Sequence, residues 1–126
     1  NKELKLLKES LVRANDIRVF IPSKNYEISK SFYQALGFKM GYVTEDLTLF
    51  ENGECAFFLQ NFYEEQFANN LMLQLSVLDI DEAYEIISNL DDFDIKYEPI
   101  KMESWGQVVH LWGPAGELWH VTEFSN

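Results

Sequence analysis

Both histidines of the 126-residue chain, His110 and His120, fall within one stretch, residues 107–124. Residues 113–116, Gly-Pro-Ala-Gly, divide it into two segments rich in aromatic and β-branched residues, which predicts a β-hairpin. An imidazole titrates near neutral pH, so it can exchange a proton or contact a polar ligand. Three roles are therefore open for His120: a structural hydrogen bond, a contact to a ligand, and general-base catalysis. His110 has a weaker claim to any of them.

Aromatic residues around the histidines favour binding over catalysis. Trp112 belongs to the hairpin, Trp105 precedes it, and Phe20 and Phe57 belong to other predicted strands. Aromatic walls with a few polar groups suit a flat or cationic small molecule. The alternative is that most of these rings belong to the core, as we expect for Trp119, which alternates with His120 along the strand.

A repeated pattern of elements must position these residues. In the first half, a strand precedes a helix that begins near Ser23 or Asn25 and ends at Gly37. In the second half, Asp79 or Asp81 caps the helix. The predicted strands are 15–21, 38–44, 47–51, 54–60, 71–78, 94–100, 108–112 and 117–124. The order βαβββ thus occurs twice, in modules 15–60 and 71–124, and predicts one pseudo-symmetric α+β domain with a cupped sheet.

Two motifs and this repeat resemble the vicinal oxygen chelate superfamily, which includes glyoxalases, bleomycin-resistance proteins and extradiol dioxygenases. Ser31-Phe-Tyr-Gln-Ala-Leu-Gly-Phe38 is similar to the family's Phe-Tyr-x-x-Leu-Gly-Phe. Trp112-Gly-Pro-Ala-Gly-Glu-Leu-Trp-His120 is similar to its Asp-Pro-x-Gly-x-x-x-Glu segment, with Gly113 in place of the aspartate. The resemblance covers roughly residues 15–124 and implies that the two modules form an open cup.

The resemblance also implies where a metal would bind, because metal-dependent members take ligands from the first and last strands of each module. By position, these slots hold Asp16, Phe57, Met72 and His120, with Arg18 and Gln74 as same-face alternatives in the first and third slots. A divalent cation needs several converging nitrogen or oxygen ligands. A set of Asp16, Gln74 and His120 is conceivable, but we expect a metal-free cup and no cofactor.

Composition restricts the partners and the setting. The net charge of −11 argues against nucleic acid, and no apolar run is long enough to span a membrane. The single cysteine, Cys55, permits no internal disulfide and favours a cytoplasmic setting. The first residues are too charged for a signal peptide, and leucines at helical spacing predict an amphipathic helix within residues 1–14, from Lys2 to Ala14.

The leading hypothesis is a metal-free homodimer that binds a small organic molecule, with cationic aromatic compounds as the candidate class, as the bleomycin-resistance branch does in antibiotic resistance by sequestration. The expected ligand-binding residues are Arg18, Phe20, Phe57, Met72, Gln74, Trp105, His110, Trp112 and His120. An enzyme is the competing class: a metal-dependent lyase, isomerase or dioxygenase using Asp16, Gln74 and His120. A third class is a non-catalytic interaction domain with an occluded cup.

Overall fold

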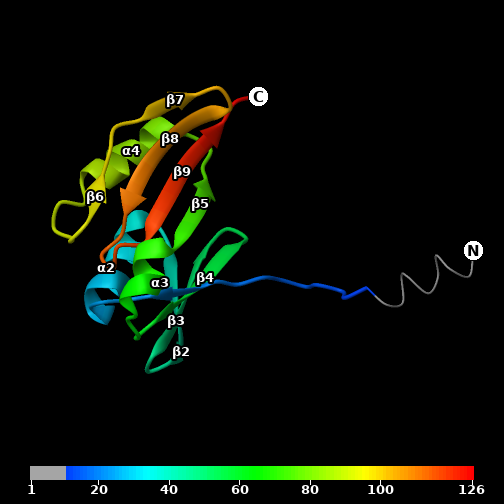
Figure 1. The fold of residues 1–126 in the computed structure, drawn as a ribbon, viewed down its shortest axis with the longest axis vertical. Helices are drawn as coiled ribbons and strands as arrows, with labels where there is room; N and C mark the ends of the chain where they lie inside the picture. The colour runs from blue at the N-terminus through cyan, green and yellow to red at the C-terminus, as the bar shows by residue number, and fades with distance from the viewer. Residues whose placement is uncertain (1–10) are drawn as a thin grey trace, which may run out of the picture.

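The computed structural model describes residues 11–126, with the order βαβββ in the first half and one additional short strand, βαββββ, in the second (Figure 1). The first half consists of β1 (Phe20–Pro22), α2 (Tyr26–Leu36), β2 (Lys39–Thr44), β3 (Leu47–Asn52) and β4 (Cys55–Gln60). The connector contains α3 (Glu65–Asn70). The second half consists of β5 (Met72–Ser76), α4 (Ile80–Ser88), β6 (Lys96–Tyr97), β7 (Lys101–Glu103), β8 (Gly106–Trp112) and β9 (Leu118–Phe124). The predicted α+β class is confirmed.

The two long helices begin and end at the residues that the sequence indicates. The Asn25 side chain accepts a hydrogen bond from the amide of Ile28 at 3.2 Å, and α2 ends at Gly37, whose φ of 124° favours glycine. Asp79 caps α4 by accepting from the amides of Asp81 and Glu82 at 3.0 and 3.2 Å. None of the helices in residues 11–126 has the length and apolar character that a membrane span requires.

The halves build two sheets of the same plan. In the first sheet, β1 runs parallel to β4, and β4, β3 and β2 follow in antiparallel order. In the second sheet, β5 runs parallel to β9, β9 pairs antiparallel with β8, and β8 also pairs with β6 and β7. Each sheet therefore places the first and last strands of its half side by side.

Two strands are shorter than the sequence predicts. The strand expected at residues 15–21 begins only at Phe20, because nothing in the described part of the chain pairs with residues 15–18. Of the strand expected at 94–100, only β6 forms, and β7, which was not predicted, follows it; the two pair with different parts of β8. Most of the predicted N-terminal helix lies outside the described residues. Residues 11–14 are not helical, and residues 11–17 extend away from both sheets (Figure 1).

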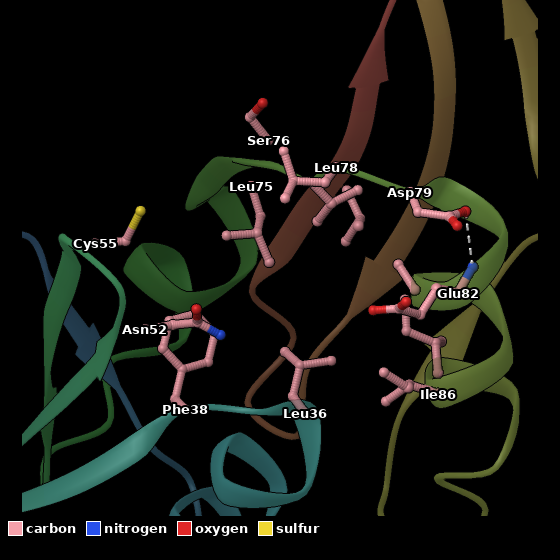
Figure 2. Close-up of a pocket in the computed structure, with 14 residues that line it drawn as sticks. Leu36, Phe38, Asn52, Cys55, Leu75, Ser76, Leu78, Asp79, Glu82 and Ile86 are labelled. Carbon is pink, nitrogen blue, oxygen red and sulfur yellow. Dashed lines mark hydrogen bonds between the residues drawn. The ribbon is translucent and has the colours of Figure 1, made fainter.

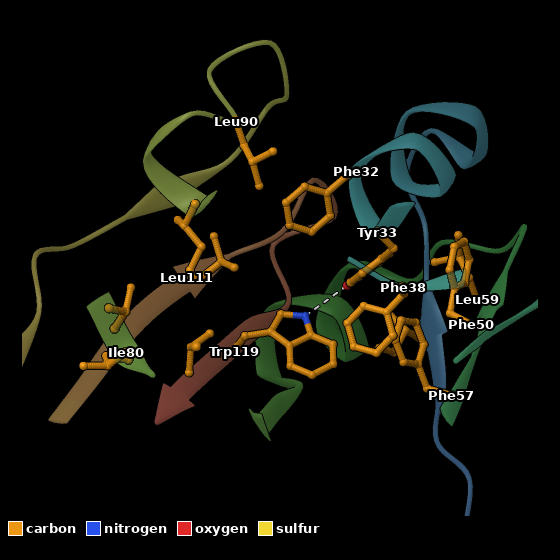
Figure 3. Packing of buried hydrophobic residues seen from close by; sticks show 14 residues of the cluster. Phe32, Tyr33, Phe38, Phe50, Phe57, Leu59, Ile80, Leu90, Leu111 and Trp119 are labelled. Atoms are coloured by element: carbon orange, nitrogen blue, oxygen red, sulfur yellow. Dashed lines mark hydrogen bonds between the residues drawn. The ribbon is translucent and has the colours of Figure 1, made fainter. Parts of the chain in front are cut away.

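An aromatic cluster joins the two halves in the core (Figure 3). The ring of Tyr33, from α2, lies 4.8 Å from that of Phe57, on β4, and 6.0 Å from that of Trp119, on β9. Trp119 is only 4% exposed, so its predicted place in the core is confirmed. Because the inner faces of both sheets pack into this core, alternate side chains on each strand point to the opposite face, which we call the outer face.

A buried carboxylate fixes the turn between β8 and β9. Glu117 is fully buried and accepts hydrogen bonds from the Tyr33 hydroxyl at 2.6 Å and the Ala115 amide at 2.9 Å. The indole N–H of Trp119 donates to the Tyr33 oxygen at 3.0 Å. Burial raises the pKa of Glu117. A Cβ at Gly113 would lie 2.6 Å from the Glu117 carboxyl carbon, so a side chain there would displace the carboxylate.

Candidate functional site

The outer face of the second sheet gathers most of the predicted site residues. Along β9, Trp119 and Val121 enter the core while His120 lies on the opposite face. The register places Gln74 of β5 and His110 of β8 on either side of His120. Strand alternation extends the same face to further predicted residues, Met72 and Trp112, and to two residues that were not predicted, Thr122 and Phe124.

A cavity of about 360 Å³ opens on this face. Its lining, which we call the outer groove, is Met72, Leu73, Gln74, Trp105, His120, Thr122 and Phe124. The rings of Trp105 and Phe124 lie 6.0 Å apart and form an apolar wall. The amide of Ser125 donates to the Trp105 carbonyl at 2.9 Å, which holds the Trp105 loop against the end of β9. The groove therefore combines an aromatic wall with amide, hydroxyl and imidazole groups.

The two histidines are in direct contact beside the groove. Their ring centroids lie 4.6 Å apart, at an interplanar angle of 72°. Partial burial and the neighbouring His110 lower the pKa of His120, so neutral pH favours the uncharged imidazole. The Nε2 atom of His120 is buried and has no hydrogen-bond partner within residues 11–126. Because buried polar atoms are normally satisfied, this nitrogen is a natural contact for a ligand or a second chain.

Charged side chains border the histidine pair. Lys96 lies over the ring of Trp112, with Nζ 4.6 Å from the ring centroid. The Trp112 ring is stacked near His110, at a centroid distance of 6.3 Å and an angle of 29°. Glu98 places a carboxylate oxygen 3.9 Å from Nδ1 of His110. Trp112 and His110 thus belong to the edge of the site, while His120 reaches the groove itself.

The outer face of the first sheet holds a second aromatic group. The rings of Phe20 and Phe58 lie 5.0 Å apart, and the guanidinium of Arg18 lies 5.6 Å from the Phe58 ring centroid. Arg18 also donates from Nε to Asp16 at 2.8 Å, and this hydrogen bond lowers the pKa of Asp16. Arg18 and Phe20 are therefore near each other, but they do not line the outer groove of the same chain.

The predicted equivalence of Phe57 and His120 is wrong by one residue. Phe57 pairs with Phe50, and Trp119 pairs with Leu111; all four side chains are buried. The counterpart of His120 is therefore Phe58, and Phe57 belongs to the core rather than to the cup. Side chains alternate between the two faces of a strand. An error of one residue in matching the two hairpins therefore moves a side chain to the opposite face.

The residues at the expected metal slots do not fit a divalent metal. With the observed register, the first and last strands of the two halves place Phe20, Phe58, Gln74 and His120 at equivalent outer positions. Two of these are phenyl rings, which offer no ligand atom. Asp16 precedes β1, and its carboxylate is held by Arg18 and by the Ile17 amide at 2.8 Å. Residues 11–126 contain no cluster of three histidine, cysteine or acidic side chains suited to a metal.

Sequence comparison gives no relatives: neither a protein-family model nor a curated protein matches the chain. Comparison of structures gives many. The bleomycin-binding protein of Streptomyces verticillus, solved with copper(II)-bleomycin, is 18% identical, with a TM-score of 0.75 over 91% of this chain and 100% of that one. TnmS3, an antibiotic-binding protein of Streptomyces sp. CB03234, is 15% identical, with a TM-score of 0.76 over 91% and 100%.

A third similar structure represents a different kind of resistance protein. The fosfomycin resistance protein FosX of Listeria monocytogenes, solved with Mn(II) and sulfate, is 12% identical, with a TM-score of 0.74 over 90% of this chain and 93% of that one. These likenesses confirm the predicted fold. They include both antibiotic-binding proteins and a protein that holds a metal, so the fold by itself leaves the activity open.

Proposed function

We propose that this chain, which has the vicinal oxygen chelate fold, binds a small aromatic organic molecule in the outer groove without a metal. The aromatic wall of Trp105 and Phe124, which faces the polar groups of Gln74 and His120, carries this proposal. A flat ring would stack against the wall and bury apolar area, and the polar groups would orient it. The resemblance to antibiotic-binding proteins supports a sequestering role, in which the ligand is held rather than converted.

His120 is proposed as the central polar contact. Its unpartnered Nε2 and lowered pKa favour a neutral imidazole that exchanges a hydrogen bond with the ligand. A positive charge on the ligand is compatible with the net charge of −11 and with the exposed ring of Trp105. Gln74, the register neighbour of His120, offers both a donor and an acceptor at the same depth.

We propose further that two copies complete the site. The outer groove is open on one side, and the outer face of the first sheet exposes the ring of Phe20 at 45%. If a second copy placed this face against the groove, Arg18 and Phe20 of the partner would close it. This arrangement would bring together predicted site residues that lie apart in one chain, and it would cover exposed aromatic surface.

Tryptophan fluorescence tests the binding proposal. The protein is titrated with 9-aminoacridine and with metal-free bleomycin, and a saturable change in emission is expected for at least one of them. Trp105→Ala should weaken binding about tenfold, which corresponds to roughly 1.4 kcal/mol of lost aromatic contact. Phe62→Ala is the matched control, because Phe62 is similarly exposed, at 54%, but lies outside the groove.

Three results would count against the proposal. One is the absence of a saturable response to either compound, and another is an equal loss of affinity in the Phe62→Ala control. The third is stoichiometric binding of Mn(II), Zn(II) or Ni(II) that is lost in His120→Ala, which would favour the metal-dependent enzyme instead. Sedimentation of the protein with and without ligand tests the dimer separately. A protein that stays monomeric and still binds the ligand with the affinity measured by fluorescence would refute the shared site.

A further inference from the structure

A second cavity, of about 340 Å³, lies between the two halves of the chain, away from the outer groove (Figure 2). Phe38, Asn52 and Cys55 line it from the first half, and residues 75–79, 82, 83, 86 and 87 line it from the second. None of its lining residues belongs to the outer groove. The proposed function does not use this cavity, which we call the inter-module pocket.

The walls of the inter-module pocket are mainly apolar. Leu36 and Phe38 border one side, and Leu75 and Ile86 border the other (Figure 2). At its rim, Leu78 is fully exposed and Ile86 is 38% exposed. Water in such a hollow has few polar partners, so an apolar group of a ligand would replace it favourably. The size of the cavity is at the lower end of the ~300–1,000 Å³ that is typical of small-molecule sites.

Among residues 11–126, the charged groups in the pocket lining are two carboxylates, Asp79 and Glu82. One oxygen of Asp79 caps α4, and the other is free to accept from a ligand. Glu82 directs its carboxylate toward the hollow (Figure 2), and within residues 11–126 neither acid forms an ion pair. Asn52 donates its side-chain N–H to the Gly37 carbonyl at 3.1 Å, which leaves its side-chain oxygen as a further acceptor.

We propose that the inter-module pocket binds small amphipathic amines, with the apolar body between the two halves and the ammonium group at Asp79 and Glu82. An ammonium group is a donor only, which suits the two carboxylates, while the Asn52 amide oxygen lies on the opposite side of the pocket (Figure 2). The apolar walls select against highly polar cations, and the carboxylates select against organic acids. The site has its own chemistry: it holds its ligand by an ionic contact on α4, whereas the outer groove uses aromatic and neutral polar groups.

The native thiol of Cys55, at the edge of this pocket, allows a direct test. Because it is the only cysteine in the chain, bimane attached to it reports on this pocket alone. Three ligands of nearly equal size but different charge are titrated: 4-phenylbutylamine, 4-phenylbutanol and 4-phenylbutyrate. Saturable binding is expected to be tightest for the amine, weaker for the alcohol and weakest for the acid. The unlabelled protein, followed by calorimetry, should give the same order.

Glutamine variants, which remove the charge of one carboxylate, test which acidic side chain contacts the ammonium group. Glu82→Gln should weaken amine binding about threefold to fivefold, the range of a partly solvated ion pair, and leave alcohol binding unchanged. Glu85→Gln is the matched control, because Glu85 lies on the same helix but does not line the pocket. Ile86→Ala should weaken amine and alcohol alike. The proposal is overturned if none of the ligands binds saturably, if the acid binds as well as the amine, or if Glu85→Gln has the same effect as Glu82→Gln.

Discussion

Replacing Glu117 with alanine should destabilise the protein strongly, because the Glu117 carboxylate is the acceptor for two groups that cannot reach water. The Tyr33 hydroxyl and the Ala115 amide donate to it at 2.6 and 2.9 Å. Each hydrogen bond to a charged acceptor contributes about 1.5–3 kcal/mol. Burial of the carboxylate offsets part of that sum, so we expect a net loss of about 3 kcal/mol in the free energy of unfolding.

Thermal and urea unfolding measure this loss. At about 4 °C per kcal/mol for a domain of this size, the Tm of Glu117→Ala should fall by about 12 °C. Glu45→Ala is the control, since Glu45 is exposed and should change stability by less than about 0.5 kcal/mol. A loss below about 1 kcal/mol in Glu117→Ala would show that the Gly113–Gly116 turn does not depend on the buried carboxylate.

The pH dependence of Glu117→Gln provides an independent check, because glutamine has nearly the same volume and does not ionise. Burial raises the pKa of Glu117 above its ordinary value of 4.5, so the folded protein holds this proton more tightly than the unfolded chain. The part of the Glu117 contribution that depends on protonation should therefore be fully present below pH 4.5 and be lost as the pH rises through the raised pKa, while the hydrogen bonds from Tyr33 and Ala115 remain. The free energy of unfolding of the wild type, relative to that of Glu117→Gln, should therefore decrease as the pH rises through the raised pKa. A difference that does not change with pH would contradict the assigned pKa direction.

Three further predictions concern the core, a tight strand contact and the histidine. Phe57→Ala should cost about 3–5 kcal/mol in unfolding free energy and Phe58→Ala about 1 kcal/mol, and equal losses in urea unfolding would contradict the corrected register. Gly106→Ala should lower Tm by more than 10 °C, roughly the effect of 3 kcal/mol, since its Cβ would lie 2.4 Å from the Glu123 carbonyl oxygen; near-wild-type melting would refute the contact. Because the pKa of His120 is lowered, the unbound protein should have the full contribution of this group above pH 6.5 and lose stability as the pH falls through the lowered value; NMR titration of the imidazole showing a raised pKa would overturn this sign.

The sequence predicted the fold because local signals and the repeat agreed. Asn25, Gly37 and Asp79 each have a physical reason to begin or end a helix, and the structure places them at those ends. The alternation that placed Trp119 in the core was equally reliable. Such signals depend only on neighbouring residues, so a single sequence contains them.

The candidate site was less predictable, because it depends on register and on contacts between distant segments. The second hairpin is one residue longer, and the prediction that matched Phe57 with His120 also matched Phe50 with Trp112; burial in the structure matches Phe50 with Leu111 instead. Alternation from His120 would have identified Thr122 and Phe124. The inter-module pocket had no comparable signal, since it exists only where the two halves meet.

Strand β5 separates the two cavities, because Gln74 faces the outer groove and its neighbour Leu75 faces the inter-module pocket. It is an edge strand, paired only with β9 within the described chain. If both proposed ligands bind and one of them displaces β5, the shape of the other cavity must change. Thermodynamic reciprocity would then require each ligand to alter the affinity of the other by the same factor, which titration of one ligand in the presence of the other would measure.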